Sequence, residues 1–227
     1  MDSFTVQRER MVGRQVEGRG VRDARVLEAM RTVPRELFVG DDMREHAYED
    51  TPLPIEAGQT ISQPYIVGLM AEAAALGPGD RVLEIGAGSG YAAAVISRIA
   101  RQVYAVERHP ELAALALRRL RDLGYDNVGI RIGDGSGGWP EVGPFDAILA
   151  AAGAPVVPDA LRRQLAVGGR LVLPVGDTRD HQRLVKLTRV GADRWTEQDL
   201  GDVRFVPLVG EHGWQEQGSE YLFQPPS

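Results

Sequence analysis

The alternation of short apolar runs with helical patterns in the middle of the chain most constrains its fold. Runs rich in Val, Ile and Leu predict buried strands at 82–85, 102–107, 127–132, 145–151 and 170–175. Apolar residues recur at helical spacing in 91–100 and 110–122. A repeat of strand, helix and strand indicates parallel strands joined by crossover connections. We therefore expect an α/β fold with a doubly wound, mostly parallel sheet.

The flanks of this alternating region carry other patterns. Apolar residues at helical spacing predict three N-terminal helices, at 5–17, 23–33 and 64–76. Beyond the last predicted strand of the core, apolar runs predict further strands at 183–190 and 203–209, joined by a turn at 191–195. Because the connection is a short turn, we expect these C-terminal strands to be antiparallel.

Three glycines, Gly86, Gly88 and Gly90, follow the first predicted strand of the core. A glycine-rich turn between a strand and a helix lets backbone N–H groups approach a nucleotide closely. Doubly wound sheets bind ligands beyond the carboxyl ends of their strands, where this loop should lie. The dinucleotide fingerprint, however, has its third glycine one position later, where this chain has Tyr91. The loop predicts a nucleotide site without deciding which nucleotide binds.

Glu84, two residues before Gly86, discriminates between the candidate ligands. A pyrophosphate within ~4 Å of this carboxylate would be repelled by about 4 kcal/mol per charge pair at a surface-like dielectric. S-adenosylmethionine instead carries an ammonium and a sulfonium beside a carboxylate. The acid favours those cations, while backbone N–H groups of the loop, Ala87 among them, favour the anion. We therefore expect S-adenosylmethionine rather than NAD.

Two further acids follow the next two predicted strands. Glu107 ends the second strand about 20 residues after Gly86, the spacing at which an acid commonly accepts hydrogen bonds from ribose hydroxyls. Asp134, flanked by glycines after the third strand, has two compatible interpretations: it accepts a hydrogen bond from an adenine amino group, or it forms a turn. Asp146 opens the fourth strand at the opposite edge, so we expect it to be structural.

Candidate catalytic groups are few. The four histidines show no metal-ligand spacing, so we expect no metal and interpret them as surface or packing residues. Residues 150–155, after the fourth strand, lack the acidic or amide cluster that an amine substrate needs, whereas an ionised carboxylate acceptor needs only alignment and shielding from water. Ser62, just before Pro64, either caps a helix or donates a hydrogen bond to a substrate carboxylate, and both interpretations stay open.

Charge and composition argue against several classes of protein. With a formal net charge of -6 and a pI near 5.3, the chain lacks the basic surface that tight binding of nucleic acid requires. No run approaches the ~20 apolar residues of a membrane span, and the N-terminus is charged rather than apolar. The absence of cysteine fits a reducing compartment. We therefore expect a cytoplasmic protein that binds neither nucleic acid nor membrane.

Several segments together resemble the protein-L-isoaspartate O-methyltransferase family. They are, in family order and at family-like spacing from about residue 5 to residue 210, GQTISQP, VLEIGAGSGYAAA, VYAVER, GDG followed by GW, PFDAI, GGRLVLPVG and VRFVPLV. The resemblance implies a class I S-adenosylmethionine-dependent methyltransferase with a Rossmann-like fold. It also implies methyl transfer to the free α-carboxylate of L-isoaspartyl residues in damaged peptides and proteins, which starts repair through a succinimide.

The resemblance also implies roles for individual residues. Ser62 matches the serine that the family treats as its active-site residue. The implied cofactor residues are Glu84, Gly86, Ala87, Gly88, Gly90, Glu107, Arg108, Gly133, Asp134 and Gly135. The implied substrate residues are Thr60, Ile61, Ser62, Gln63 and Val206. This chain has Tyr65 where many relatives have histidine and Ser136 where many have an aromatic residue, so its substrate contacts should differ in detail.

These observations predict one methyltransferase domain over residues 1–210, followed by a polar, unstructured tail at 211–227. The expected parts of the domain are a helical part that covers the substrate, a cofactor-binding core and the C-terminal strands, at 1–78, 79–176 and 177–210. We expect a monomer that methylates isoaspartyl peptides and proteins and releases S-adenosyl-L-homocysteine. Two alternatives stay open: esterification of ordinary aspartate in a dedicated peptide, and S-adenosylmethionine binding without catalysis.

Overall fold

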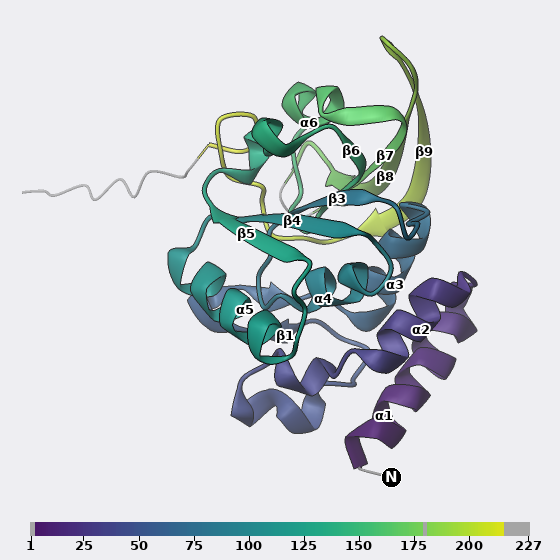
Figure 1. The fold of residues 1–227 in the computed structure, drawn as a ribbon, viewed down its shortest axis with the longest axis vertical. Helices are drawn as coiled ribbons and strands as arrows, with labels where there is room; N and C mark the ends of the chain where they lie inside the picture. Colours follow the sequence, from purple (N-terminus) through teal and green to yellow (C-terminus); the bar gives the residue numbers. More distant parts are fainter. Residues whose placement is uncertain (1–2, 179–180, 216–227) are drawn as a thin grey trace, which may run out of the picture.

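The computed structural model describes residues 3–178 and 181–215, and a seven-stranded sheet in the order β5-β4-β3-β6-β7-β8-β9 forms its core (Figure 1). Neighbouring strands from β5 to β7 pair in parallel, whereas β7, β8 and β9 pair antiparallel. The strands are β3 Arg81–Ile85, β4 Gln102–Glu107, β5 Val128–Ile132, β6 Phe145–Ala150, β7 Leu165–Val175, β8 Gln182–Gly191 and β9 Arg194–Val203. The mostly parallel sheet with antiparallel C-terminal strands is confirmed.

The order of the strands reverses at β3. From β3 the chain moves outward to β4 and β5 on one side and then returns to β6 on the other. At such a reversal the connections leave the two neighbouring strands in opposite directions, which opens a crevice beyond the carboxyl ends. The glycine loop that follows Ile85 therefore lies at the crevice.

The helices cover the two faces of the sheet unequally (Figure 1). One face carries a thick layer, made of α1 Ser3–Met11, α2 Ala24–Thr32, α3 Pro64–Ala73, α4 Tyr91–Ser97 and α5 Pro110–Asp122. The other face carries α6 Asp159–Arg163 and two short 3-10 turns at Gly135–Gly137 and Pro140–Val142. Successive residues of a strand point to opposite faces, so Val82 packs into the thick layer while Leu83 and Ile85 pack into the thin one.

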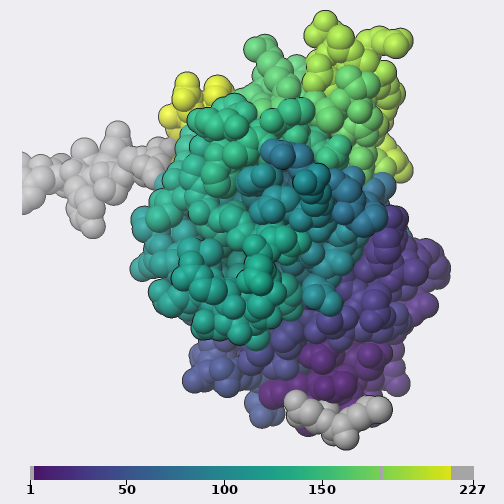
Figure 2. Space-filling view, in the orientation of Figure 1, coloured from purple at the N-terminus to yellow at the C-terminus, as the bar shows by residue number. Residues whose placement is uncertain are grey.

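The N-terminal part packs under the sheet as a continuous body, seen as the purple to blue region of Figure 2. The three predicted N-terminal helices are confirmed, and α2 ends before Pro34, whose ring cannot continue a helix. The first helix extends through a π turn and a 3-10 turn, Val12–Val16 and Glu17–Arg19. No helix within the described ranges is long and apolar enough to cross a membrane.

A small two-stranded sheet was missed by the sequence analysis. Strand β1, Leu53–Pro54, pairs antiparallel with β2, Thr60–Ile61, around a 3-10 turn at Glu56–Gly58. Two-residue strands carry too little apolar alternation to be recognised in a sequence. The sheet matters because β2 ends directly before Ser62.

The prediction of a strand at 203–209 was wrong. The last strand, β9, runs from Arg194 to Val203, and the chain then crosses the carboxyl ends of the sheet as an irregular segment. In this segment Phe205 donates its N–H to the side chain of Gln182, and Leu208 donates its N–H to the carbonyl of Gly153. These partners lie in β8 and in the loop after β6, so the apolar run is held by a loop instead of extending the sheet. The true strand was missed because an edge strand is largely exposed and its sequence is polar.

The polar tail was expected to begin at residue 211, but the structure folds residues 211–215 against the domain. The indole N–H of Trp214 donates to the carbonyl of Gly153, and the N–H of Glu211 donates to the Asp134 carboxylate. The rest of the predicted tail, residues 216–227, lies outside the described residues. The folded part of the chain therefore reaches at least residue 215.

Candidate active site

The glycine loop leaves the carboxyl end of β3 and leads into α4. Gly86, Gly88 and Gly90 have φ angles of 86°, 52° and 89°, in the left-handed region that residues with a Cβ rarely adopt. A Cβ added at Gly90 would also lie 3.3 Å from the Cβ of Ala116 in α5. The loop therefore requires glycine both for its backbone conformation and for its packing on α5.

Glu107, the last residue of β4, holds this loop in place. Its Oε2 accepts a hydrogen bond from the N–H of Gly88, and its Oε1 accepts one from the N–H of His109, both at 2.9 Å. Glu107 is only 4% exposed, yet a carboxylate offers about four acceptor positions and these bonds use two of them. Because Glu107 lies in the wall of a cleft, its remaining acceptor positions suit a pair of neighbouring hydroxyl groups.

This first cleft lies beyond the carboxyl ends of β3, β4 and β6. With its open mouth it encloses about 600 Å³, within the range of sites for small ligands. Seven residues predicted from the sequence line it, namely Thr60, Gly86, Gly88, Glu107, Arg108, Gly135 and Val206. The crevice that the strand order predicts is therefore a real cavity.

Glu84 does not line the first cleft. Its side chain lies on the helical face of β3, 2% exposed, and within the described residues its Oε2 has no hydrogen-bond partner. Burial raises the pKa of Glu84 well above its usual value, and the nearby charge of Glu107 raises it further. Glu84 borders a small cavity together with Ser62, Val67, Met70, Ala71, Ala92, Ile96, Leu149 and Ala151. The unpaired oxygen therefore favours a ligand group that brings a positive charge or a hydrogen-bond donor.

Ser62 follows β2 and precedes α3. The helix N-cap is Gln63, and no side chain caps it, so the interpretation of Ser62 as a helix cap is wrong. Within the described part of the chain, the Ser62 hydroxyl has no hydrogen-bond partner. It borders both the small cavity beside Glu84 and a larger second cleft. A hydroxyl with a free donor in a cleft wall can bind an incoming acceptor group.

The second cleft joins the first. Four residues line both of them, namely Thr60, Ala151, Val206 and Pro207. The wall of the second cleft also includes Arg19, Gln63, Tyr65, Leu69, Arg204 and Phe205, which come from the N-terminal part and from the segment after β9. A ligand in one cleft can thus touch a ligand in the other, the arrangement that group transfer between two substrates requires.

Asp134 forms a turn. Its Oδ1 accepts hydrogen bonds from the N–H and the hydroxyl of Ser136, at 2.8 and 2.7 Å, and its Oδ2 accepts one from the N–H of Glu211 at 2.8 Å. Burial acts to raise the pKa of Asp134, but the hydrogen bonds from Ser136 and Glu211 outweigh it, and the pKa lies below the usual value. The turn interpretation is confirmed, and the contact with adenine stays a prediction.

Comparison with known proteins identifies the family. A model of "Protein-L-isoaspartate(D-aspartate) O-methyltransferase (PCMT)" matches residues 6–213, most of the chain. The chain belongs to this family. The match ends within the folded segment that follows β9, in agreement with the docked residues 211–215.

Relatives of this methyltransferase family match over nearly their full length. The chain is 60% identical over 208 residues to protein-L-isoaspartate O-methyltransferase 2 of Pelobacter propionicus, covering 92% of each chain. It is 57% identical over 218 residues to protein-L-isoaspartate O-methyltransferase 1 of Rhodopseudomonas palustris, covering 96% of this chain and 89% of the relative.

Solved structures agree with the family. A protein-L-isoaspartate O-methyltransferase superposes with a TM-score of 0.82 at 32% identity, covering 91% of this chain and 67% of the other. A putative family member from Plasmodium falciparum, solved in complex with S-adenosyl-L-homocysteine, superposes with a TM-score of 0.77 at 27% identity, covering 89% and 98%. The Rossmann-like methyltransferase fold is therefore confirmed.

The sequence analysis missed some residues of the first cleft. His109 was interpreted as a surface or packing residue, yet it lines the first cleft, as do Ala151 and Pro207. His109 and Ala151 could have been predicted, because they come just after the carboxyl ends of β4 and β6, where ligands bind in such sheets. Pro207 offered no signal, because its segment was interpreted as a strand. No group of three or more metal-ligating side chains occurs within residues 3–178 and 181–215.

Other predicted site residues lie beside the clefts rather than in their walls. Ala87, Gly90 and Gly133 belong to the loops that follow β3 and β5, and Ile61 is buried in β2. Asp146, predicted to be structural, accepts the N–H of Arg81 at 2.9 Å at the amino end of β3.

Proposed function

We propose that this chain methylates the free α-carboxylate of L-isoaspartyl residues from S-adenosylmethionine, with Ser62 binding the acceptor carboxylate. Isoaspartyl methylation is the activity of the family to which the chain belongs. The observation that carries the role of Ser62 is its unpaired hydroxyl in the wall of the second cleft, which shares wall residues such as Ala151 with the first cleft.

The first cleft and its surroundings fit S-adenosylmethionine. Glu107 has acceptor positions left for ribose hydroxyls, and the ammonium of the methionine moiety would give the buried Oε2 of Glu84 its missing partner. The backbone of Gly86, Gly88 and Gly135 lines the cleft that would hold the nucleoside, and Ala87 and Gly133 belong to the same loops. Bound S-adenosylmethionine supplies a methyl group activated by the adjacent sulfonium charge.

The acceptor carboxylate needs few catalytic groups. An ionised carboxylate is already a nucleophile, so no general base is required, and orientation accounts for most of the acceleration. Ser62 donates a hydrogen bond to one carboxylate oxygen and leaves the other free to face the methyl group. The start of α3, directly after Ser62 and Gln63, favours the anion by about 0.3–1 kcal/mol.

The product explains a role in repair. Methylation converts the carboxylate into an ester, which the next backbone nitrogen attacks to close a succinimide ring with release of methanol. Hydrolysis of that ring returns part of the material to a normal aspartyl linkage. The enzyme therefore only has to make the ester.

The substrate peptide runs along the segment after β9. An enzyme that accepts many sequences must bind main-chain groups, and residues 203–207 line the second cleft together with Tyr65 and Gln63. Replacing Val206 by proline removes one backbone N–H, with Val206→Ala as the matched control. We expect a higher KM for isoaspartyl peptide in the proline variant alone, and equal KM values would overturn this peptide path.

The decisive experiment for the function is methyl transfer to matched peptides. Labelled S-adenosylmethionine is offered with peptides that differ only in an isoaspartyl or an aspartyl linkage, and we expect base-labile label in the isoaspartyl peptide. Label in the aspartyl peptide alone would favour the alternative of a dedicated aspartate methyltransferase. Cofactor binding by calorimetry without any transfer would favour a non-catalytic binding protein.

The enzyme works as a cytoplasmic monomer on isoaspartyl proteins and does not bind nucleic acid. The net charge of -6 and the absence of cysteine support this proposal. Whether the chain accepts D-aspartyl residues, which the family description includes, is tested by adding a D-aspartyl version of the same peptide. Sedimentation at assay concentration is expected to give a mass of 24.7 kDa.

A further inference from the structure

A buried arginine lies behind the proposed acceptor site. Arg35, in the 3-10 turn Arg35–Leu37, is 0% exposed and makes no ion pair with a carboxylate within the described residues. Burial lowers the pKa of its guanidinium to about 10, so the group remains charged at neutral pH. Burying a charge without a counter-ion destabilises the fold, so the other contacts of Arg35 must offset that cost.

The contacts of Arg35 join two parts of the site. Its Nη2 donates a hydrogen bond to the carbonyl of Ser62 at 2.8 Å, and its Nε donates one to the carbonyl of Ala47 at 2.7 Å. The guanidinium carbon lies 4.8 Å from the ring centre of Tyr91. Tyr91 is the first residue of α4 and directly follows Gly90, the last glycine of the cofactor loop. One rigid group therefore touches both the carbonyl of Ser62 and the ring of Tyr91, the residue that follows the glycine loop.

We propose that Arg35 is a positioning residue for methyl transfer, which fixes the backbone of Ser62 relative to the start of α4. The inference rests on the proposed function of Ser62. A planar guanidinium can hold two carbonyls and stack on a ring at once, which an ammonium cannot. Because displacements of about 1 Å in an aligned site cost up to a hundredfold in rate, the distance from Ser62 to α4 governs the alignment of acceptor and methyl group.

A second arginine in the same region is a natural control. Arg8 donates hydrogen bonds to the carbonyl of Arg31 at 2.7 Å and to the hydroxyl of Tyr48 at 3.1 Å, and it lies 3.7 Å from a carboxylate oxygen of Glu36. Like Arg35, it ties segments of the N-terminal part together through a largely buried side chain. Unlike Arg35, it makes no hydrogen bond to Ser62 and no cation–π contact with Tyr91 within the described residues. Neither arginine lines the two clefts.

The test compares Arg35→Lys with Arg8→Lys in the full chain. Melting temperature, cofactor Kd, kcat and the KM for isoaspartyl peptide are measured for each. We expect both variants to lower the melting temperature. Only Arg35→Lys should lower kcat, by about ten- to a hundredfold, with cofactor Kd changed by less than about twofold. Arg35→Gln, which removes the charge, serves if the lysine variant is not folded at the assay temperature, and the same loss of kcat is expected.

A double-mutant cycle with Ser62→Ala separates positioning from general stability. If Arg35 acts through Ser62, then Arg35→Lys has no further effect on kcat in the Ser62→Ala background, although it still lowers the melting temperature. An unchanged kcat for Arg35→Lys, or the same loss of kcat in both backgrounds, would overturn the inference. If Ser62→Ala alone is fully active, the proposed role of Ser62 fails as well, and that single variant makes the two failures distinguishable.

Discussion

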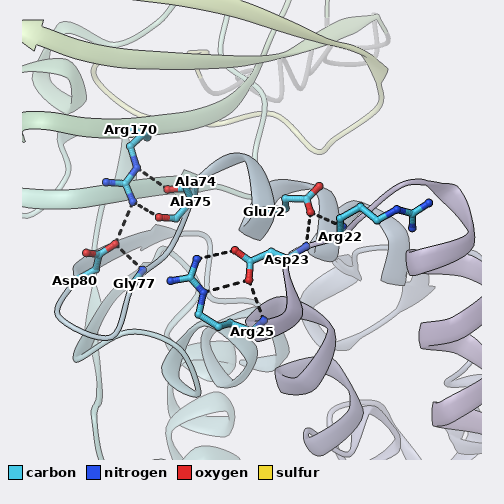
Figure 3. A network of polar contacts seen from close by, with 9 residues as sticks. All are labelled: Arg22, Asp23, Arg25, Glu72, Ala74, Ala75, Gly77, Asp80 and Arg170. Carbon is cyan, nitrogen blue, oxygen red and sulfur yellow. Dashed lines mark hydrogen bonds and ion pairs between the residues drawn. The ribbon is translucent and has the colours of Figure 1, made fainter.

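The two ends of α3 differ in how their polar groups are satisfied. At its C-terminal end, Arg170 from β7 donates hydrogen bonds to the carbonyls of Ala74 and Ala75, both at 2.6 Å, and forms an ion pair with Asp80 at 3.1 Å (Figure 3). Ala75 has a φ of 48°, unusual for a residue with a side chain. The guanidinium therefore holds a turn whose backbone conformation is unfavourable.

Glu72 ties the same end of α3 to the N-terminal part of the molecule. Its Oε1 accepts hydrogen bonds from the N–H groups of Arg22 and Asp23, directly before α2 (Figure 3). Asp23 caps α2 by accepting the N–H of Arg25. The C-terminal end of α3 is thus enclosed by polar contacts from both sides.

The N-terminal end of α3 is open by comparison. No side chain caps it, the Ser62 hydroxyl has no partner within the described residues, and neither has Oε2 of nearby Glu84. An unpaired polar atom that is buried, as Oε2 of Glu84 is, costs about 1–3 kcal/mol. The contrast teaches that the chain satisfies the polar groups of one end to fix the helix, and leaves a serine hydroxyl and a carboxylate oxygen near the other end free for ligands.

Removing the clamp at the closed end should have the largest effect. Replacing Arg170 by methionine leaves two carbonyls without their donor and removes the ion pair with Asp80, so we expect a loss of about 3 kcal/mol in the free energy of unfolding. Urea denaturation measures it. Arg170→Lys is the control and should lose less. A stability equal to wild type would show that this end of α3 is not clamped.

Changing Ser62, at the N-terminal end of α3, should lower activity and leave stability almost unchanged. Ser62→Ala removes one hydrogen bond to a charged acceptor, so we expect kcat to fall roughly thirtyfold, about 2 kcal/mol in activation free energy. Stability and cofactor Kd should stay within about 0.5 kcal/mol of wild type. Single-turnover kinetics and calorimetry measure these quantities, and Ser62→Thr, which keeps a hydroxyl, is the control. An equal loss in cofactor binding would contradict the role in acceptor binding.

Glu84→Gln should weaken cofactor binding about tenfold, about 1.4 kcal/mol, because the amide cannot neutralise the ammonium. The same variant should stabilise the ligand-free protein at pH values above the folded pKa of Glu84, where it removes a buried charge. Calorimetry and denaturation of one protein sample measure both effects. Weaker binding together with lower stability would indicate a packing defect instead.

The pH dependence of Glu84 follows from its raised pKa. Between the unfolded pKa and the raised folded pKa, the native state holds a proton that the unfolded state has lost. The contribution of Glu84 to stability is therefore fully present below the unfolded pKa and is lost as pH rises through the folded pKa. Cofactor affinity should rise over the same interval, because the bound ammonium favours the ionised acid. Parallel pH profiles of wild type and Glu84→Gln would contradict both trends.

The smallest effect is expected from Glu72→Gln. The amide oxygen can still accept the N–H groups of Arg22 and Asp23, so only the charge near the start of α2 is lost, worth about 0.3–1 kcal/mol. Thermal melts at low and high salt measure the difference, which should shrink with salt. Glu72→Ala is the comparison and should lose more. A difference that is independent of salt would mean that the charge is not the cause.

The sequence was sufficient wherever the physical requirement is local. The parallel strands, the glycine loop and Glu107 were all predicted, because apolar periodicity and positive φ angles restrict single segments of the chain. Edge strand β9 and the small sheet before Ser62 were missed, because neither buries a continuous apolar face.

By itself, then, the sequence determined a Rossmann-like sheet with an acid-flanked glycine loop, and its motifs indicated the family. Only the tertiary structure decided that Glu84 is buried beside Ser62, that residues 204–209 line the clefts, and that Arg35 joins Ser62 to the start of α4. The physical reason is the distance along the chain over which each effect acts. Backbone preferences act within a few residues, whereas burial, pKa and the meeting of distant side chains depend on how the whole chain packs.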